Sequence, residues 1–413
     1  MSGSLVVHPP HPPAERAPSR RASSLNRREA LCAVFGAAAW AAGCGSRPAS
    51  LPGRGALPVK PRVDAGVTPE VDARWERVVR AFEESLESSP APGGAIGVVL
   101  DGKPALMTAR GVRKLGTSAP VTTATLFRLE SVTKTFTSLA ALSLVEQQVL
   151  DLDAPMADLI PWVSFSDGAA GRGVTLRRLL THTAGLSRNQ ILKLRDVRRG
   201  HEYQDLFSKN VLSLGPIDRF EYSNTGYLLV GAAIERASKT PFDEALRALV
   251  TKPVGMVSAT TDGAVALTRE HADGFGVDEG GRERSFDPPY LDPYVQRPVG
   301  GLHASVDELC LFTSRLLGRV PEVLRSETFE DMMNKHTSTN ERDVWYGYGV
   351  YRIDSPQGPV WTHTGAGLGS TACFVCAPRK RFAFVAITNA GRYRGWRDLR
   401  RVAEEAFLGA ALF

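Results

Sequence analysis

The stretch Leu126-Phe-Arg-Leu-Glu-Ser131-Val-Thr-Lys134-Thr-Phe-Thr-Ser138 places a hydroxyl and an amine three residues apart at the start of an apolar stripe. That stripe recurs at helical spacing after Ser131 and consists of Val132, Phe136, Leu139 and Leu142. Residues three apart share one face of a helix, so we expect Lys134 to lie beside the Ser131 oxygen. Serine needs such a base to act as a nucleophile, and a helix N-terminus favours the negative charge that develops on it. Taken alone, the tetrad is weak evidence, because a serine that only caps a helix is the alternative.

Two further motifs follow it along the chain. Tyr222-Ser223-Asn224 lies about ninety residues on, and His363-Thr364-Gly365 lies near the C-terminus. Together with Ser131 and Lys134 they are typical of an acyl-transfer site built on a serine nucleophile.

Six segments, in order along residues 75–410, resemble the class C β-lactamase and penicillin-binding-protein-like serine hydrolases. They are the stretch quoted above, Leu179-Leu-Thr-His-Thr-Ala-Gly-Leu186, Phe220-Glu-Tyr-Ser-Asn-Thr-Gly226, Pro253-Val-Gly-Met256, Gly300-Gly-Leu302 and Trp361-Thr-His-Thr-Gly-Ala366. Six elements in order are far more specific than one tetrad. The resemblance implies a β-lactamase-like α+β or α/β fold, with an antiparallel sheet flanked by helices and an inserted, mainly helical domain.

The resemblance also implies roles for the first two motifs. Ser131 is similar to the acylated nucleophile, and Lys134 to the residue that activates it. Tyr222 resembles the group that passes a proton to the leaving group and later helps to activate water. A phenol titrates near 10, so we expect a nearby cation to make Tyr222 useful as a base. Asn224 resembles an anchor for a substrate amide or carbonyl that also holds Lys134.

The third motif is implied to form an edge strand along which substrate lies, with His363, Thr364 and Gly365 as substrate-binding residues. The backbone N–H groups of Ser131 and Ala366 are implied to make the oxyanion hole, whose donors stabilise the transition state by several kcal/mol. Many β-lactamases have Lys where this chain has His363. Since histidine is mostly neutral at pH 7, the departure weakens the case for strong β-lactam hydrolysis. The His-x-Gly form of this motif instead resembles that of certain secreted D,D-carboxypeptidases, D-aminopeptidases and esterases.

These observations predict a serine hydrolase that cleaves an amide or ester of a small molecule or peptide, without metal or other cofactor. The alternative is a penicillin-binding or structural lipoprotein with the same fold and little turnover. We expect His182 and Thr183 to close a loop through hydrogen bonds. The Cys373-Phe-Val-Cys376 spacing on a predicted strand points the two thiols to opposite faces, so we expect buried free cysteines rather than a metal site.

The order of predicted elements suggests how the 413 residues are organised. Strand patterns at both ends surround a helical middle, so we expect one α/β domain from residues 70–124 and about 340–413, and a helical domain from about 125–339, with the active site between them. Val71, Trp75, Val78, Phe82 and Leu86 recur every three or four residues and predict an amphipathic helix. Asp101-Gly102 predicts a hairpin turn between strands 94–100 and 105–111. Further predicted strands are 344–353, 360–363, 370–377 and 382–388, and a final helix covers about 395–408. The formal charge of +6 is too weak to indicate nucleic acid.

The first 44 residues are typical of an export signal. Arg27-Arg28 precedes thirteen uncharged residues, 30–42, and resembles a twin-arginine signal. Small residues before Cys44 resemble a lipoprotein cleavage site, so Cys44 is the candidate lipidated residue. We expect a lipid anchor there to be the only contact with a membrane. Residues 45–69 form a Pro- and Gly-rich linker. We therefore expect a periplasmic or membrane-anchored protein; a disordered tail with a fortuitous apolar run is the alternative.

Overall fold

A nine-stranded antiparallel sheet is the largest element of the computed structural model, which describes residues 62–63, 69–190, 202–277, 283–288, 294–391 and 393–413. Its strands run in the order β1-β3-β2-β15-β14-β13-β12-β11-β10. The strands are β1 (Arg62–Val63), β2 (Gly93–Leu100), β3 (Lys103–Gly111), β10 (Thr337–Ser338), β11 (Val344–Tyr346), β12 (Tyr351–Ser355), β13 (Gly358–Ala366), β14 (Thr371–Ala377) and β15 (Phe382–Thr388). Both ends of the described chain therefore build one sheet, as the strand patterns predict.

Most of the described helices and three short strand pairs lie between β3 and β10. The helices are α2 (Pro69–Glu87), α3 (Thr133–Glu146), α4 (Met156–Leu159), α5 (Gly168–Gly171), α6 (Leu176–Leu180), α7 (Glu202–Ser208), α8 (Asn224–Ser238), α9 (Phe242–Leu246), α10 (Lys252–Val254), α11 (Gly263–Leu267), α12 (Arg297–Gly300), α13 (Val306–Leu317), α14 (Ser326–Met332) and α15 (Trp396–Leu408). Helix α2 precedes β2, and α15 follows β15. The paired strands are β4 (Phe127–Arg128) with β9 (His303–Ala304), β5 (Ser164–Phe165) with β6 (Val211–Leu212), and β7 (Gly274–Val277) with β8 (Glu283–Phe286).

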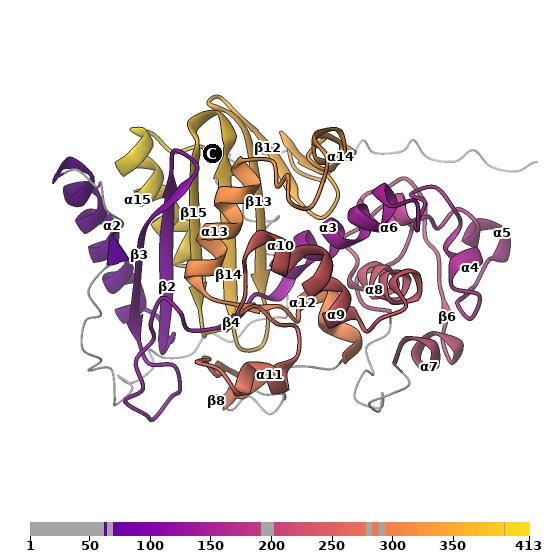
Figure 1. Cartoon of the computed structure of the whole chain (residues 1–413), viewed down its shortest axis with the longest axis horizontal. Coiled ribbons are helices and arrows are strands. Elements are labelled where there is room, and N and C mark those ends of the chain that lie inside the picture. Colours follow the sequence, from indigo (N-terminus) through magenta and orange to yellow (C-terminus); the bar gives the residue numbers. More distant parts are fainter. Residues whose placement is uncertain (1–61, 64–68, 191–201, 278–282, 289–293, 392) are drawn as a thin grey trace, which may run out of the picture. The chain divides into compact units, whose positions relative to one another are not determined.

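Helices cover the sheet because each presents an apolar face to it. In α2 the predicted stripe is buried, and α2 packs against α15; its members are Trp75, Val78, Phe82 and Leu86. Helix α13 crosses strands β2, β3 and β15 (Figure 1). It comes so close that a Cβ at Gly97 would collide with Cys310 Sγ. The prediction of an antiparallel sheet flanked by helices is thus confirmed.

Helix α3 lies at the centre of the helical region and is buried from Thr133 to Leu144. It contacts α8 and α12, and a helix that is enclosed on every side needs no polar face. Two of its buried polar side chains, Ser138 and Thr135, bond to Tyr227 Oη at 2.9 Å and to the Gly349 carbonyl at 2.7 Å, respectively. The first turn of α3, with Lys134, is consequently held rigidly.

Two local predictions meet different outcomes. The turn between β2 and β3 is confirmed, because Asp101 and Gly102 both have positive φ, 51° and 72°, as a two-residue hairpin of this type requires. The single strand predicted over 344–353 is wrong. The chain leaves the sheet at Gly347 and returns at β12, and Gly349 (φ 73°) lies so close to α3 that a Cβ would be 2.8 Å from the Lys134 carbonyl oxygen.

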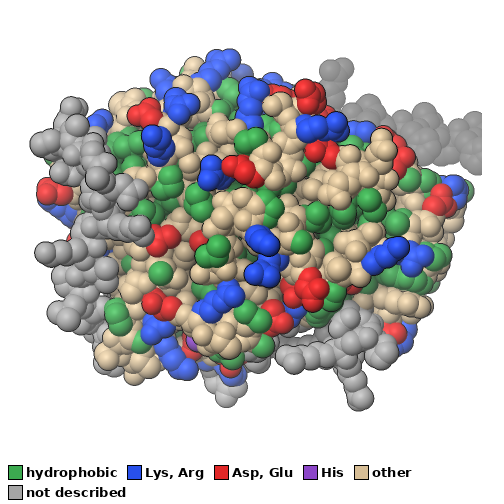
Figure 2. Space-filling model, in the orientation of Figure 1, with side chains coloured by type: hydrophobic (Ala, Val, Ile, Leu, Met, Phe, Trp, Pro, Cys, Tyr) green, Lys and Arg blue, Asp and Glu red, His purple; other side chains and the backbone are tan. Residues whose placement is uncertain are grey.

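Other predictions concern termini, cysteines and surface. The export signal, Cys44 and nearly all of the 45–69 linker lie outside the described residues. Within the described residues, no helix combines the length and apolarity that crossing a bilayer requires. Cys310, Cys373 and Cys376 are buried free thiols, as predicted. Figure 2 shows basic and acidic side chains interspersed over the described part of one face.

Candidate active site

The predicted nucleophile and base lie together where the chain enters α3. Ser131 is in the middle of a 3₁₀ turn, Glu130–Val132, and Lys134 is in the first turn of α3. Lys134 Nζ donates to Ser131 Oγ at 3.0 Å and to the backbone carbonyl of Val299 at 2.9 Å. The Ser131 side chain caps neither helix, so its hydroxyl is not used for capping.

Lys134 is fully buried, and burial is the main reason why the pKa of its amine lies well below the ordinary value. The positive charge of Arg188 lowers this pKa further, whereas Glu130 opposes the shift. An amine whose charged form is disfavoured is a better proton acceptor near neutral pH. Lys134 therefore has both the position and the electrostatic environment of a general base.

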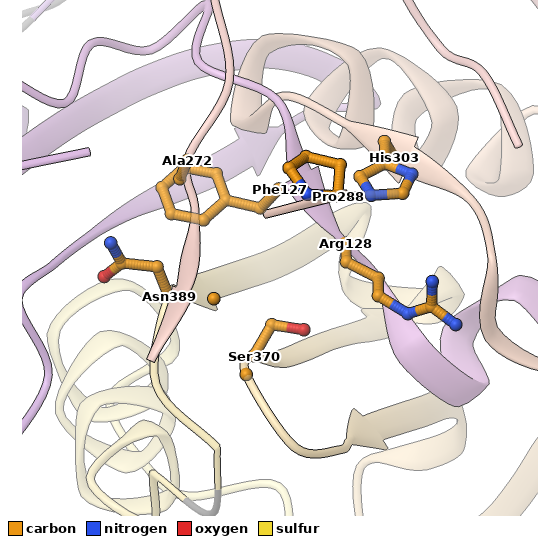
Figure 3. Close-up of a pocket in the computed structure, with 9 residues that line it drawn as sticks. Phe127, Arg128, Ala272, Pro288, His303, Ser370 and Asn389 are labelled. Atoms are coloured by element: carbon orange, nitrogen blue, oxygen red, sulfur yellow. The ribbon is translucent and has the colours of Figure 1, made fainter. Parts of the chain in front are cut away.

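A small cavity lined by both polar and apolar residues lies beside the turn that carries Ser131 (Figure 3). Arg128 from β4 and Ser370, just before β14, line it, and each interacts with Glu130: Arg128 Nε lies 3.4 Å from Glu130 Oε1, and Ser370 Oγ donates to the same oxygen at 3.1 Å. Glu130 has a left-handed backbone, with φ of 49°, which is costly for a non-glycine residue. These contacts hold the strained turn that presents Ser131.

Tyr222 comes from the loop before α8 and lies against the same amine. Lys134 Nζ is 5.1 Å from the centroid of its ring, and the guanidinium carbon of Arg188 is 4.9 Å from it. Burial raises the pKa of Tyr222 to about 12, while the Ser131 hydroxyl and Arg188 act in the opposite direction. The expected cation is present, since Arg188 acts to lower this pKa, but desolvation is the larger effect and the pKa is raised overall.

His182 holds both sides of Tyr222. Its backbone carbonyl accepts from the N–H of Glu221 at 2.8 Å, and its Nδ1 accepts from the N–H of Ser223 at 3.1 Å. The imidazole and the Tyr222 ring lie with centroids 4.3 Å apart. The predicted loop-closing role of His182 is thereby confirmed, and its target is the loop that carries Tyr222.

Asn224 is the first residue of α8, and Ser223 caps that helix by accepting from the N–H of Gly226. The Asn224 amide nitrogen donates to Asn189 Oδ1 at 2.8 Å. Among the described residues its buried Oδ1 has no hydrogen-bond partner, and Lys134 donates elsewhere. The expectation that Asn224 holds Lys134 is not met in this structure; its free acceptor instead suits an N–H group of a ligand.

His363 is buried in β13, and both ring nitrogens are hydrogen-bonded. Nδ1 lies 2.8 Å from the Thr364 carbonyl and so donates to it, which leaves Nε2 to accept from Tyr346 Oη at 3.1 Å. Burial, with Lys134 acting in the same direction, lowers the pKa of His363 to about 3. The expected neutral imidazole is present, and a direct contact with a ligand would have to break one of these two bonds.

Strand β13 is not an edge strand, because β12 and β14 flank it in the sheet. Pairing with β12 nevertheless stops at Thr362, so the backbone from His363 to Ala366 has no strand partner on that side within the described residues. Thr364 is half-buried and Ala366 is exposed there. The open edge predicted for a ligand therefore exists, but only over the last residues of an interior strand.

Gly365 brings this open edge against the nucleophile. A Cβ at Gly365 would collide with the Leu129 carbonyl and lie 2.8 Å from the Ser131 nitrogen. Only glycine allows such an approach, and it places the backbone of Ala366 next to that of Ser131. The two predicted oxyanion donors are thus on adjoining segments.

One residue near the site, Arg188, lies outside all of the quoted motifs. Arg188 lies two residues beyond the quoted 179–186 segment, and its carbonyl accepts from the N–H of Asn224 at 2.9 Å. Its exposed side chain acts on both Lys134 and Tyr222. Its position directly after a segment of the resemblance was the available signal, but only the fold brings it over Tyr222.

Comparisons with known proteins identify the family of this chain. A family model described as Beta-lactamase matches residues 78–406. Penicillin-binding protein 4 of Amycolatopsis lactamdurans is 31% identical over 340 residues, 77% of this chain and 85% of that protein. Esterase EstB of Burkholderia gladioli is 32% identical over 197 residues, 44% of this chain and 50% of that protein.

Solved structures also resemble this chain in fold. The octameric penicillin-binding protein homologue from Pyrococcus abyssi superposes with a TM-score of 0.70 at 23% identity, covering 83% of this chain and 78% of that one. At this level of identity the likeness concerns the fold alone, whereas the family model spans most of the sequence. The chain therefore belongs to the beta-lactamase family of serine hydrolases.

Proposed function

We propose that this protein is an exported serine hydrolase that cleaves an amide or ester through an acyl-enzyme on Ser131. The observation that carries the proposal is the 3.0 Å contact between Lys134 Nζ and Ser131 Oγ, made by a buried amine of lowered pKa. A hydroxyl next to a deprotonated amine can lose its proton as it attacks a carbonyl carbon.

In acylation, Ser131 Oγ bonds to the substrate carbonyl carbon while Lys134 takes the hydroxyl proton. The N–H groups of Ser131 and Ala366 receive the charge that forms on the carbonyl oxygen. Tyr222, whose raised pKa keeps its phenol protonated at neutral pH, gives that proton to the leaving amine or alcohol as the bond to it breaks. The products of this step are the acyl-serine, a phenolate and a protonated lysine.

Deacylation reverses these transfers with water. The Tyr222 phenolate takes a proton from water as the oxygen attacks the acyl carbon, and the protonated Lys134 returns a proton to Ser131 Oγ. Lys134 stabilises the phenolate in between, since its Nζ lies 5.1 Å from the ring centroid. The cycle then ends with the free carboxylic acid and the starting protonation states.

The candidate substrates are D-amino-acid peptides, small esters and β-lactams. The named relatives, a penicillin-binding protein and an esterase, support the same range. The neutral His363 supports peptidase or esterase activity over strong β-lactam hydrolysis, because the site lacks a fixed cation at that position.

The test combines active-site labelling with a turnover screen. A fluorescent phosphonate and a fluorescent penicillin should add to Ser131, located by peptide mass spectrometry, and D-Ala-D-Ala peptides, p-nitrophenyl esters and a chromogenic cephalosporin should reveal turnover. Ser131→Ala should abolish both labelling and turnover while the protein still folds. Ser208→Ala, which alters an exposed serine at the end of α7, is the matched control. Turnover retained in Ser131→Ala would contradict the proposal.

Two further parts of the proposal have separate outcomes. A protein that is labelled on Ser131 but turns nothing over fits the alternative, a penicillin-binding lipoprotein. Export and lipidation of Cys44 are tested by mass spectrometry of the N-terminus from cells: a lipid-modified Cys44 is expected, and an unprocessed cytoplasmic chain beginning at Met1 would contradict it.

A further inference from the structure

Arg188 places a guanidinium over one of the rings of the proposed active site. Its main chain is anchored, since the carbonyl accepts from the N–H groups of Asn224 at 2.9 Å and Thr225 at 3.3 Å. Its side chain is exposed, and the guanidinium carbon lies 4.9 Å from the centroid of the Tyr222 ring. The positive group is thus held at the solvent side of Tyr222.

The other basic groups around it, Lys134, His182 and His363, are buried. Burial lowers the pKa values of Lys134 and His182 well below their ordinary values and that of His363 to about 3. Arg188 therefore carries the positive charge that acts on Lys134, Tyr222 and Tyr351 from this side. Many β-lactamases are expected to have a fixed lysine where this chain has His363. Arg188 instead brings a positive charge to the same group of residues from a different loop.

The guanidinium also has unused binding capacity. None of the described carboxylates forms an ion pair with Arg188, whereas Arg172 and Arg319, which are also exposed, each pair with one. A planar guanidinium with free N–H groups pairs with a carboxylate through two parallel hydrogen bonds. The chemistry that Arg188 offers at this place is recognition of an anion.

We propose that Arg188 is the anion anchor of the site and that the preferred acyl substrates carry a carboxylate close to the scissile carbonyl. The inference rests on the proposed function, because it assigns a ligand group to the same nucleophile. It narrows the substrate class to anionic amides or esters, and it makes Arg188, rather than His363, the residue that determines specificity for charge.

The test compares matched esters. One pair differs on the acyl side, the p-nitrophenyl monoester of glutaric acid against p-nitrophenyl pentanoate; the other differs on the leaving group, 3-acetoxybenzoate against 3-acetoxybenzamide. The wild type should favour the anionic member of at least one pair in kcat/KM by roughly 10- to 100-fold, as expected for a charge-assisted hydrogen bond. This ratio should fall as salt is raised, since the guanidinium is exposed.

Variants identify the residue responsible. Arg188→Gln should bring the ratio close to one, and Arg188→Lys should keep part of it, because a lysine retains the charge but not the paired geometry. Arg247→Gln removes another exposed arginine, at the end of α9, and should keep the wild-type ratio. The ratio, not the absolute rate, is the readout.

The outcomes separate this inference from the proposed function. Wild-type turnover of the neutral esters without any preference for the anionic ones would overturn the anchor and leave the hydrolase in place. Arg188→Gln that slows both members of a pair alike would also overturn it, because Arg188 would then act only on Lys134 and Tyr222. Absence of both turnover and a Ser131 adduct would instead contradict the hydrolase itself.

Discussion

The backbone N–H of Ser223 donates to Nδ1 of His182 at 3.1 Å, directly after the proposed proton donor Tyr222. On the other side of Tyr222, the N–H of Glu221 donates to the carbonyl of the same histidine at 2.8 Å. His182 itself has a left-handed backbone, with φ of 59°. One strained residue thus sets the place of the loop that brings the phenol to Lys134.

Removing this acceptor should misplace Tyr222. We expect His182→Phe, which keeps an aromatic ring but accepts no hydrogen bond, to lower kcat about 10²-fold with KM changed less, because small displacements of catalytic groups have effects of this size. His182→Asn should retain more activity, since its side-chain oxygen can replace Nδ1 and asparagine tolerates a left-handed backbone. Kinetics on an ester, with urea unfolding as the check on folding, decide this. Full activity in His182→Phe would contradict the positioning role.

The acidic limb of the kcat/KM–pH profile should report Lys134. Lysine must be neutral to accept the Ser131 proton, so activity falls as pH drops below the Lys134 pKa. Arg188 lowers that pKa, and Arg188→Gln should therefore raise it and move the acidic limb to higher pH. The profile is measured with a neutral ester, so that loss of an anion anchor does not enter. In the control variant Arg247→Gln the acidic limb should keep its position. If it also kept its position in Arg188→Gln, Arg188 would not act on Lys134.

The contact between β13 and the nucleophile turn should tolerate no side chain. In Gly365→Ala the new methyl group would collide with the Leu129 carbonyl and lie 2.8 Å from the Ser131 nitrogen. We expect a loss of about 1–3 kcal/mol in the free energy of unfolding, typical of overpacking, and a fall in kcat as the two oxyanion donors separate. Gly168→Ala, where nothing lies within 4 Å, should change neither. Equal stability and activity of the two variants would refute the close approach.

Acid should destabilise the protein partly through His363. Its pKa is about 3 in the folded state, against an ordinary value of 6.5. Between these values the unfolded chain binds a proton that the native state does not, so this contribution is complete above pH 6.5 and is lost as pH falls toward 3, at about 1.4 kcal/mol per pH unit. Urea unfolding from pH 6.5 to 4.5 should show a shallower dependence in His363→Gln than in the wild type. Parallel curves would mean that His363 is not buried in its neutral form.

The site was predictable where chemistry is local. Ser131 and Lys134 are three residues apart, and a turn leading into a helix places them together whatever surrounds them. The helix α2, the β2–β3 turn and the strands β14 and β15 likewise follow from periodicity and turn residues nearby in the chain. The prediction of one strand over 344–353 failed because this segment is a hairpin, β11 paired with β12, whose turn at Gly349 lies against α3.

The amino-acid sequence by itself determined the family, the order of the motifs and the residue types that the reaction needs. Tertiary structure alone decided how readily each group carries a charge, because burial lowers the pKa values of Lys134 and His363 and raises the pKa of Tyr222. The tertiary structure also places an exposed cation at the site, because it brings the guanidinium of Arg188 over the ring of Tyr222. Desolvation and through-space charge depend on what encloses a group, and a linear pattern does not contain that information.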